Sequence, residues 1–185
     1  MTLRLARAAA AAVAAVALLT ACTDDSEPAI EEDAMYCDLI NPETVQPITG
    51  GHQIKDFGGP VPKSDTRTIK CNLYDADDRE DLLAVYAYEV TADKMAQERD
   101  ETTRRMADHA AAGDAHYVAV DEDGVLGFAW FTGDVAAAHL LTEDRNISVT
   151  APSSQAQAER YTAVVLEVAR QIDANLDAWD AENDS

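Results

Sequence analysis

The sequence contains few basic residues, which excludes the partners that depend on them. Only 14 of its 185 residues are Lys or Arg, against 35 Asp or Glu, so the net charge at pH 7 is −21 with histidine neutral. Nucleic-acid binding rests mainly on Lys and Arg side chains that neutralise phosphates, and adsorption to anionic headgroups needs clustered basic residues. We therefore expect no nucleic-acid partner and no membrane attachment through charge. The acidic excess favours solubility and repulsion between copies.

No apolar run is long enough to cross a membrane. The longest, residues 8–19, contains only Ala, Val and Leu, whereas a spanning helix needs roughly 20 residues. It follows Arg4 and Arg7, which form the short basic region of an export signal. Ordinary signal peptidase prefers small residues at positions −3 and −1, but a cut before Cys22 would place Leu19 at −3. The run therefore indicates a different class of export signal.

The residues that end this segment, Leu19-Thr20-Ala21-Cys22, resemble the bacterial lipobox. In lipoproteins with this motif the cysteine becomes the first mature residue and carries a diacylglycerol on its sulfur. Two or more acyl chains hold a protein stably on a membrane, whereas one chain binds marginally. The resemblance implies that residues 1–21 are a lipoprotein signal peptide and that Cys22 anchors the chain to the outer, extracytoplasmic face of the cell membrane. The alternative is a signal peptide cut elsewhere, which would leave Cys22 as a spare thiol.

Residues 22–35 form an acidic stretch that contains Pro28 and has almost nothing to bury. Loss of residues 1–21 removes two basic residues and no acidic one, so the mature net charge becomes −23. A segment of this composition cannot offset the entropy of ordering, and we expect a disordered tether. A single α+β domain should follow over residues 36–180, with an acidic tail over 181–185.

Cysteine is scarce, since the chain has only Cys37 and Cys71 besides Cys22. A structural zinc site would need four closely spaced ligands, such as a C-x2-C pair, and the sequence supplies no such spacing. An even pair of cysteines in an oxidising compartment favours a disulfide. Closing a loop of about 35 residues in this way contributes roughly 4 kcal/mol in the chain-entropy model.

The domain opens with the pattern of a short helix and a loop. Asn41 is a suitable helix N-cap, and Pro42 fits the first helical position. Gly50 and Gly51 end the helix. Residues 52–66 have the Gly and Pro content of a loop.

Two strands and a second helix are expected next. Residues 67–75 alternate between apolar and polar side chains, which predicts a half-buried strand with Cys71 on its core side. Residues 82–90 are apolar on both faces and predict a central strand. Residues 92–112 have helical composition with a weak apolar face, so they predict a surface helix that ends at Gly113.

The second half predicts a meander of three or four strands and one long helix. Asp123-Gly124 is a type I′ turn pair between two apolar runs, and Gly133-Asp134 opens another reversal. After Ser154, apolar residues recur at spacings of three and four, which indicates a long amphipathic helix. The element order predicts an α+β fold, with an antiparallel sheet of about five or six strands flanked by three helices.

The chain also lacks the motifs of common catalytic sites. It has no G-x-S-x-G elbow, Walker loop or dinucleotide glycine fingerprint, and its four histidines are scattered: His52, His109, His116 and His139. We therefore expect no cofactor and assign no catalytic residue. A hydrolytic enzyme is the alternative, and it requires one cleft that unites several of five residues: His52, His109, His116, Asp121 and Glu89.

One acidic cluster offers a weak metal candidate. Asp75, Asp77, Asp78 and Asp81 lie close together in the sequence, and carboxylates are the ligands that calcium prefers. A solvated turn explains the same residues, and we do not predict a metal site. Weak binding of a divalent cation such as calcium is the alternative.

Four aromatic residues on the predicted strands could line a ligand pocket between sheet and helix. They are Tyr86, Tyr88, Phe128 and Trp130. Gly127 and Ala129 alternate with the last two, and small residues permit close approach of a helix or ligand. The alternative is that all four belong to the core, as aromatic residues on central strands usually do.

Residues 36–74 combine "YCDLINPETVQPITG", a long Gly/Pro loop and then "CNLY". With Cys22 before it, this pattern resembles small actinobacterial lipoproteins of a family classed only as a domain of unknown function; Leu73 stands where that family often has Trp. The resemblance implies an envelope location, a disulfide between Cys37 and Cys71, and a helix-flanked antiparallel sheet. We expect a noncatalytic extracytoplasmic module that binds an unknown envelope protein or a small ligand.

Overall fold

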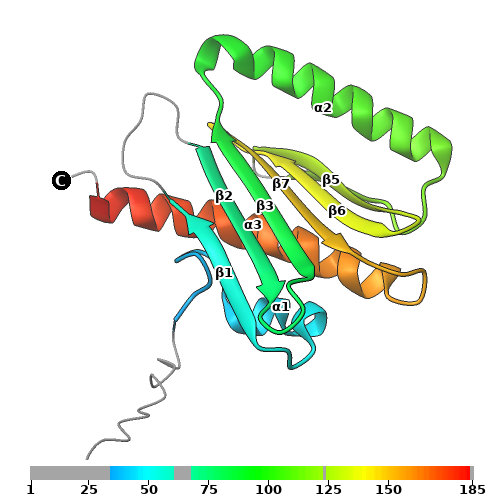
Figure 1. Ribbon diagram of the computed structural model, residues 1–185. Helices are drawn as coiled ribbons and strands as arrows, with labels where there is room; N and C mark the ends of the chain where they lie inside the picture. Colours follow the sequence, from blue (N-terminus) through cyan, green and yellow to red (C-terminus); the bar gives the residue numbers. More distant parts are fainter. Residues whose placement is uncertain (1–33, 61–67, 123, 184–185) are drawn as a thin grey trace, which may run out of the picture. The chain divides into compact units, whose positions relative to one another are not determined.

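The computed structural model describes residues 34–60, 68–122 and 124–183, and Figure 1 shows the arrangement of their helices and strands. The helices are α1 (Pro42–Thr49), α2 (Ala92–Ala112) and α3 (Ala158–Asn183). The strands are β1 (Ile54–Gly59), β2 (Thr68–Asp75), β3 (Asp81–Glu89), β4 (Val118–Glu122), β5 (Val125–Thr132), β6 (Val135–Leu141) and β7 (Arg145–Pro152). No helix in the described ranges is long and apolar enough to cross a membrane.

The strands form one sheet in the order β1-β2-β3-β7-β6-β5-β4. All neighbouring pairs are antiparallel. Two meanders, β1–β2–β3 and β4–β5–β6–β7, meet where β3 pairs with β7. The α+β class and the antiparallel sheet are therefore confirmed, whereas the expected count of five or six strands was too low, because the described sheet has seven.

The additional strand is β1, which lies inside the segment predicted as a loop. It ends in Gly58 and Gly59, whose φ angles are 117° and 125°. A Cβ atom on Gly58 would lie 1.8 Å from the carbonyl oxygen of Lys70 on β2. Gly58, one of the glycines that indicated a loop, is thus the residue that allows β1 to approach β2 closely.

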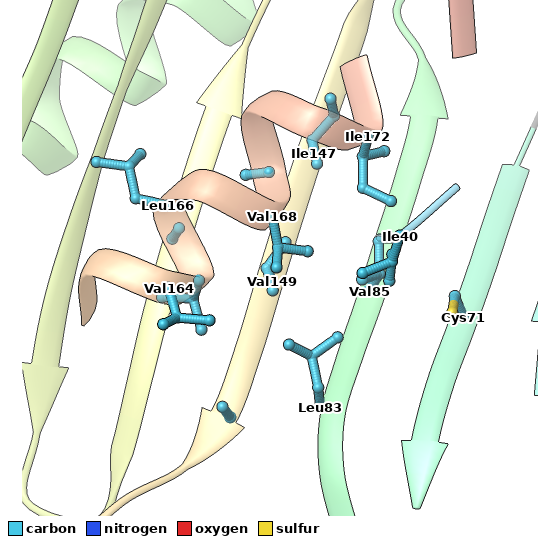
Figure 2. Close-up of a cluster of buried hydrophobic side chains, with 14 of the residues drawn as sticks. Ile40, Cys71, Leu83, Val85, Ile147, Val149, Val164, Leu166, Val168 and Ile172 are labelled. Atoms are coloured by element: carbon cyan, nitrogen blue, oxygen red, sulfur yellow. The ribbon is translucent and has the colours of Figure 1, made fainter. Parts of the chain in front are cut away.

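Helix α3 covers one face of the sheet. Val165, Val168 and Ile172 are fully buried, and Figure 2 shows Val168 over Val149 of β7 in the hydrophobic core. The helix packs on β5, β6 and β7, with α1 beside it. The amphipathic stripe predicted from the sequence is therefore confirmed. The helix continues to Asn183, into the segment expected to be a tail.

The short first helix begins and ends where the sequence predicts. The Oδ1 atom of Asn41 accepts a hydrogen bond from the backbone N–H of Glu43 at 2.8 Å. Gly50 ends the helix in the left-handed conformation, with φ of 59°. A disulfide between Cys37 and Cys71 then joins the segment before α1 to β2, with 6.0 Å between the two Cα atoms. Cys71 is fully buried on the core side of its strand, as predicted.

Helix α2 lies on the opposite face and covers only part of it. Its main contacts are with β5 and β6, and Figure 1 shows it away from β1 and β2. Tyr88 of β3 donates a hydrogen bond to Glu98 of α2 at 3.4 Å, and the side-chain amide of Asn146 donates to the same carboxylate at 3.0 Å. The sheet is therefore covered on both faces at β5 and β6, but on one face at β1 and β2.

Candidate functional site

The four aromatic residues expected to line a pocket project to the α2 side of the sheet, but they divide into two pairs. Phe128 and Trp130 lie on β5, whereas Tyr86 and Tyr88 lie on β3, and β6 and β7 separate the two strands. Phe128 is fully buried, and its ring centroid lies 4.9 Å from those of both Trp130 and His109. The β5 pair is thus part of the packing beneath α2.

Gly127 serves a different contact, the one between strands β5 and β6. A Cβ atom there would lie 2.1 Å from the backbone oxygen of His139 and 2.9 Å from the Cα atom of Leu140. The group that approaches Gly127 closely is therefore strand β6. The close approach that the sequence pattern indicated is one between neighbouring strands.

Tyr86 belongs instead to an uncovered surface, which we call the open face. It comprises eight side chains that point to the α2 side from β1, β2, β3 and β7: Lys55, Phe57, Lys70, Asn72, Ala84, Tyr86, Ser148 and Thr150. Phe57 is 73% exposed and Tyr86 43% exposed, although large apolar side chains are normally buried. The open face contains a cavity of about 230 Å³ beside Tyr86.

The open face is cationic in a strongly acidic chain. Its two charged residues are Lys55 and Lys70, and among the described residues no carboxylate lines the cavity beside Tyr86. The Nζ atom of Lys70 lies 5.7 Å from the ring centroid of Tyr86, a cation–π distance. Asn72, Ser148 and Thr150 complete the polar lining of the cavity.

Ser148, in the cavity wall, is hydrogen-bonded to a buried histidine. Its hydroxyl oxygen lies 3.3 Å from Nδ1 of His139, and the Nε2 atom of that ring lies 3.2 Å from the hydroxyl of Thr102 on α2. Burial, with a smaller contribution from the Arg105 guanidinium, lowers the pKa of His139 from 6.5 to about 4. The imidazole is therefore neutral near pH 7.

This hydroxyl–imidazole–hydroxyl chain has the connectivity of a nucleophile, a base and an orienting group, but its electrostatics oppose hydrolysis. A general base works best with a pKa near the operating pH, and the pKa of His139 is lower than that. A hydroxyl from Thr102 also lacks the negative charge with which a carboxylate stabilises an imidazolium. We interpret these two hydrogen bonds of His139 as a structural link between α2 and β7. His139 was not singled out from the sequence, because its partners are 37 and 9 residues away.

The residues required by the hydrolase alternative lie on separate elements. His52, in the turn after α1, pairs with Asp75. His109, near the end of α2, lies 2.5 Å from Asp114 through its Nδ1 atom. His116 lies between α2 and β4, where its ring is 6.5 Å from that of Phe131. Asp121 is on the edge strand β4 and Glu89 is on β3, and strands β7, β6 and β5 lie between them.

The acidic cluster after β2 forms a turn. The Oδ1 atom of Asp75 accepts from the backbone N–H of Asp77 at 2.8 Å, and Asp78 accepts in the same way from Glu80 at 2.9 Å. The Asp77 N–H holds the pKa of Asp75 below its usual value, with His52 contributing less. Asp81 begins β3. Across the described ranges, no three His, Cys, Asp or Glu side chains are grouped so that they could hold a metal ion.

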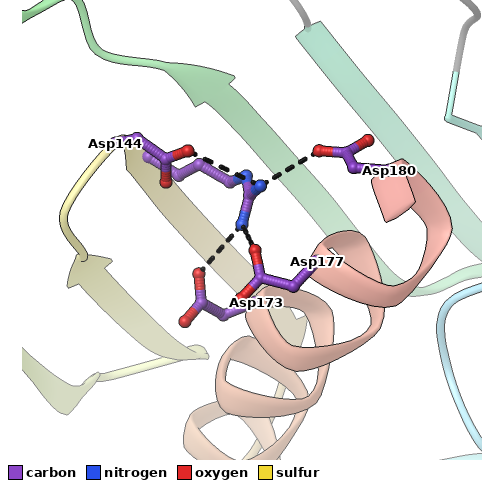
Figure 3. A network of polar contacts seen from close by, with 5 residues as sticks. Asp144, Asp173, Asp177 and Asp180 are labelled. Carbon is purple, nitrogen blue, oxygen red and sulfur yellow. Dashed lines mark hydrogen bonds and ion pairs between the residues drawn. The ribbon is translucent and has the colours of Figure 1, made fainter. Parts of the chain in front are cut away.

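A second polar cluster surrounds Arg145 at the start of β7 (Figure 3). Its side chain is 6% exposed and donates to Asp177 at 2.6 Å and Asp180 at 3.1 Å. Asp173 and Asp144 lie slightly farther away, at 3.5 and 3.6 Å. A cavity of about 450 Å³ adjoins the cluster. Because three of the carboxylates come from α3, Arg145 holds the end of this helix against the sheet.

The sequence analysis did not identify the cluster around Arg145, although its three aspartates on α3 follow a recognisable pattern. Asp173, Asp177 and Asp180 recur at helical spacings of four and three, which places them on one face. Nothing in the sequence identifies Arg145 as their partner. Burial raises the pKa of Asp173, and Arg145 offsets this in part.

The predicted lipidation site lies outside the described residues. Cys22 and the rest of residues 1–33 therefore have no structural account here. The disulfide of Cys37 and Cys71 is present.

Comparisons with known proteins do not assign the chain to a family. No family model and no curated protein matches it. One solved structure, described as a GTP-binding regulator from Thermotoga maritima, aligns over 73% of this chain and 91% of its own, with 8% identity and a TM-score of 0.32. A score of that size is too low for the likeness to carry any argument about this chain.

Proposed function

We propose that the chain is a noncatalytic binding module held on the extracytoplasmic face of the cell membrane by acyl chains on Cys22. The lipobox-like Leu19-Thr20-Ala21-Cys22 supports the anchor. The Cys37–Cys71 disulfide fits an oxidising compartment. The likeness of residues 36–74 to actinobacterial lipoproteins supports the same location. The partner is an envelope protein or a small ligand.

The open face is the observation that carries the binding role. Exposed apolar patches rimmed by polar residues mark interaction sites. Aromatic residues in particular are enriched at interfaces. Phe57 and Tyr86 are exposed on the part of the sheet that α2 leaves uncovered. Lys70 and Lys55 give this surface a charge opposite to that of the chain as a whole.

The anchor is tested with the full chain in a bacterial host that processes lipoproteins. After feeding with labelled palmitate, the wild-type chain should carry the label and sediment with membranes. The Cys22→Ser variant should lose both properties. An unlabelled wild-type chain in the cytosol, with Cys37 and Cys71 reduced, would contradict the proposed location.

The binding surface is tested by photo-crosslinking. A photoreactive residue at position 86 in the full chain should yield adducts in intact cells. The same residue at Glu101, which is exposed on α2, is the matched control and should yield none. Adducts at both positions, or at neither, would count against the open face as the binding surface.

A further inference from the structure

We infer that the cavity beside Tyr86 binds a sugar acid, a single pyranose-sized ring that carries one carboxylate, with the ring on Tyr86 and the carboxylate at Lys70. This inference rests on the proposed binding function and adds the chemistry of the ligand. It concerns the cavity lined by Lys70, Asn72, Tyr86, Ser148 and Thr150.

The size of the cavity limits the ligand. Its volume is about 230 Å³, below the roughly 300–1,000 Å³ of pockets that hold drug-sized molecules. It is also bounded by short side chains, since Ala84 lies beside Tyr86 on β3. A single ring fits such a space, whereas a larger ligand would extend beyond the cavity onto the rest of the open face.

The polar side chains of the lining offer hydrogen-bond donors and acceptors around one ammonium group. Lysine offers three donors and no acceptor, while the side chains of Asn72, Ser148 and Thr150 can both donate and accept. The neutral His139 can donate its Nδ1 hydrogen to Ser148, which leaves the Ser148 hydroxyl hydrogen for the cavity. A ligand with a carboxylate and several hydroxyl groups matches this set.

Charge selects an anion with a single charge. The chain has a net charge of −21, yet no carboxylate of the described residues lines this cavity. Lys70 is the one cation in the cavity lining, and one ammonium group neutralises one carboxylate. A lysine acts as a point charge, whereas arginine is the residue preferred for bidentate phosphate recognition.

The aromatic ring selects a ligand with an apolar side. Tyr86 is 43% exposed, and a tyrosine presents an apolar ring with a polar tip. A pyranose has C–H groups on its faces and hydroxyl groups at its edges, so it can lie on the ring while its hydroxyls reach Asn72 and Thr150. A simple carboxylate such as acetate lacks this second contact.

Calorimetric titration of the full chain with D-glucuronate tests the inference. We expect saturable binding at millimolar concentration, and weaker binding of D-glucose and of acetate, which each lack one of the two contacts. Lys70→Gln should weaken glucuronate binding about tenfold or more, because a charge-assisted hydrogen bond is lost. Tyr86→Ser should also weaken it, while Lys94→Gln, an exposed lysine on α2, should leave it unchanged.

Three results would overturn the inference: no glucuronate binding, equal binding of acetate, or full binding by Lys70→Gln. Binding to phosphatidylglycerol vesicles that depends on Lys70, without glucuronate binding, would assign the surface to lipid instead. These results are separable from failure of the proposed function. Crosslinking at position 86 tests the binding surface without glucuronate, and palmitate labelling tests the anchor without any ligand.

Discussion

The Nδ1 atom of His139 lies 3.3 Å from the hydroxyl of Ser148, so a buried ring beneath α2 and a hydroxyl in the open cavity share one hydrogen bond. On its other side the ring meets Thr102 of α2 at 3.2 Å. Because both contacts belong to a neutral imidazole, protonation of His139 would disturb the packing of α2 and the wall of the cavity together.

His139 should make the stability of the domain depend on pH. Its pKa is about 4 in the folded chain and 6.5 as a free side chain. Between these values the unfolded chain binds the proton and the folded chain does not, so stability falls as pH decreases. We expect this residue to account for a loss of about 2 kcal/mol in the free energy of unfolding between about pH 7 and about pH 5.

Urea unfolding at the two pH values measures this loss. His139→Gln should be less stable near neutral pH and should lose less on acidification than the wild type. His116→Gln changes an exposed histidine and should keep the wild-type dependence. Equal pH dependence in His139→Gln and wild type would show that His139 titrates normally.

The disulfide should supply a large part of the stability. Cys37 and Cys71 are 34 residues apart, and in the chain-entropy model their bond contributes about 4 kcal/mol by restricting the unfolded chain. The double variant Cys37→Ala/Cys71→Ala should lose about this free energy in urea unfolding. Cys22→Ser, which removes the third thiol, should unfold like the oxidised wild type. A double variant as stable as wild type would contradict the prediction.

Local patterns predicted much of the fold. The cap at Asn41, the alternation around Cys71 and the stripe through Val165 and Ile172 each reflect contacts between neighbours in the chain, and each is present in the structure. The order of the strands was not predictable in this way. Pairing of β3 with β7 joins Val85 to Val149, and only packing of the whole domain determines such a distant pair.

The open face was predictable in part. Alternation in residues 67–75 already placed Lys70 and Asn72 on the solvent side of β2. The apolar composition of residues 82–90, however, predicted a strand covered on both faces. Tyr86 is exposed because α2 lies over β5 and β6, and the position of a helix with a weak apolar face cannot be deduced from its own sequence.

Arg145 should be essential for stability. The side chain is buried and aspartates surround its charge, so Arg145→Met leaves several carboxylates of α3 without their cation. Removal of one partner from a buried ion pair typically costs about 3–5 kcal/mol. Arg104→Met is the matched control, since its ion pairs with Glu101 and Asp108 are exposed and such pairs contribute little. Chemical unfolding measures the loss in free energy of unfolding for both variants. Equal losses in Arg145→Met and Arg104→Met would contradict a structural role for the cluster.

Gly127 should tolerate no side chain, because strand β6 occupies the space. In Gly127→Ala the new methyl group would lie 2.1 Å from the His139 carbonyl oxygen, and backbone atoms in the middle of a sheet cannot move aside without loss of strand pairing. Overpacking costs about 1–3 kcal/mol and occasionally more, and a clash with backbone atoms belongs at the upper end of that range. Gly133→Ala is a suitable comparison: its φ of 65° strains an alanine, but no atom lies within 4 Å of the added Cβ. That strain costs only about 1–2 kcal/mol. Thermal or urea unfolding should therefore show Gly127→Ala to be the more destabilised of the two variants. The reverse ranking would mean that β5 and β6 are farther apart than described.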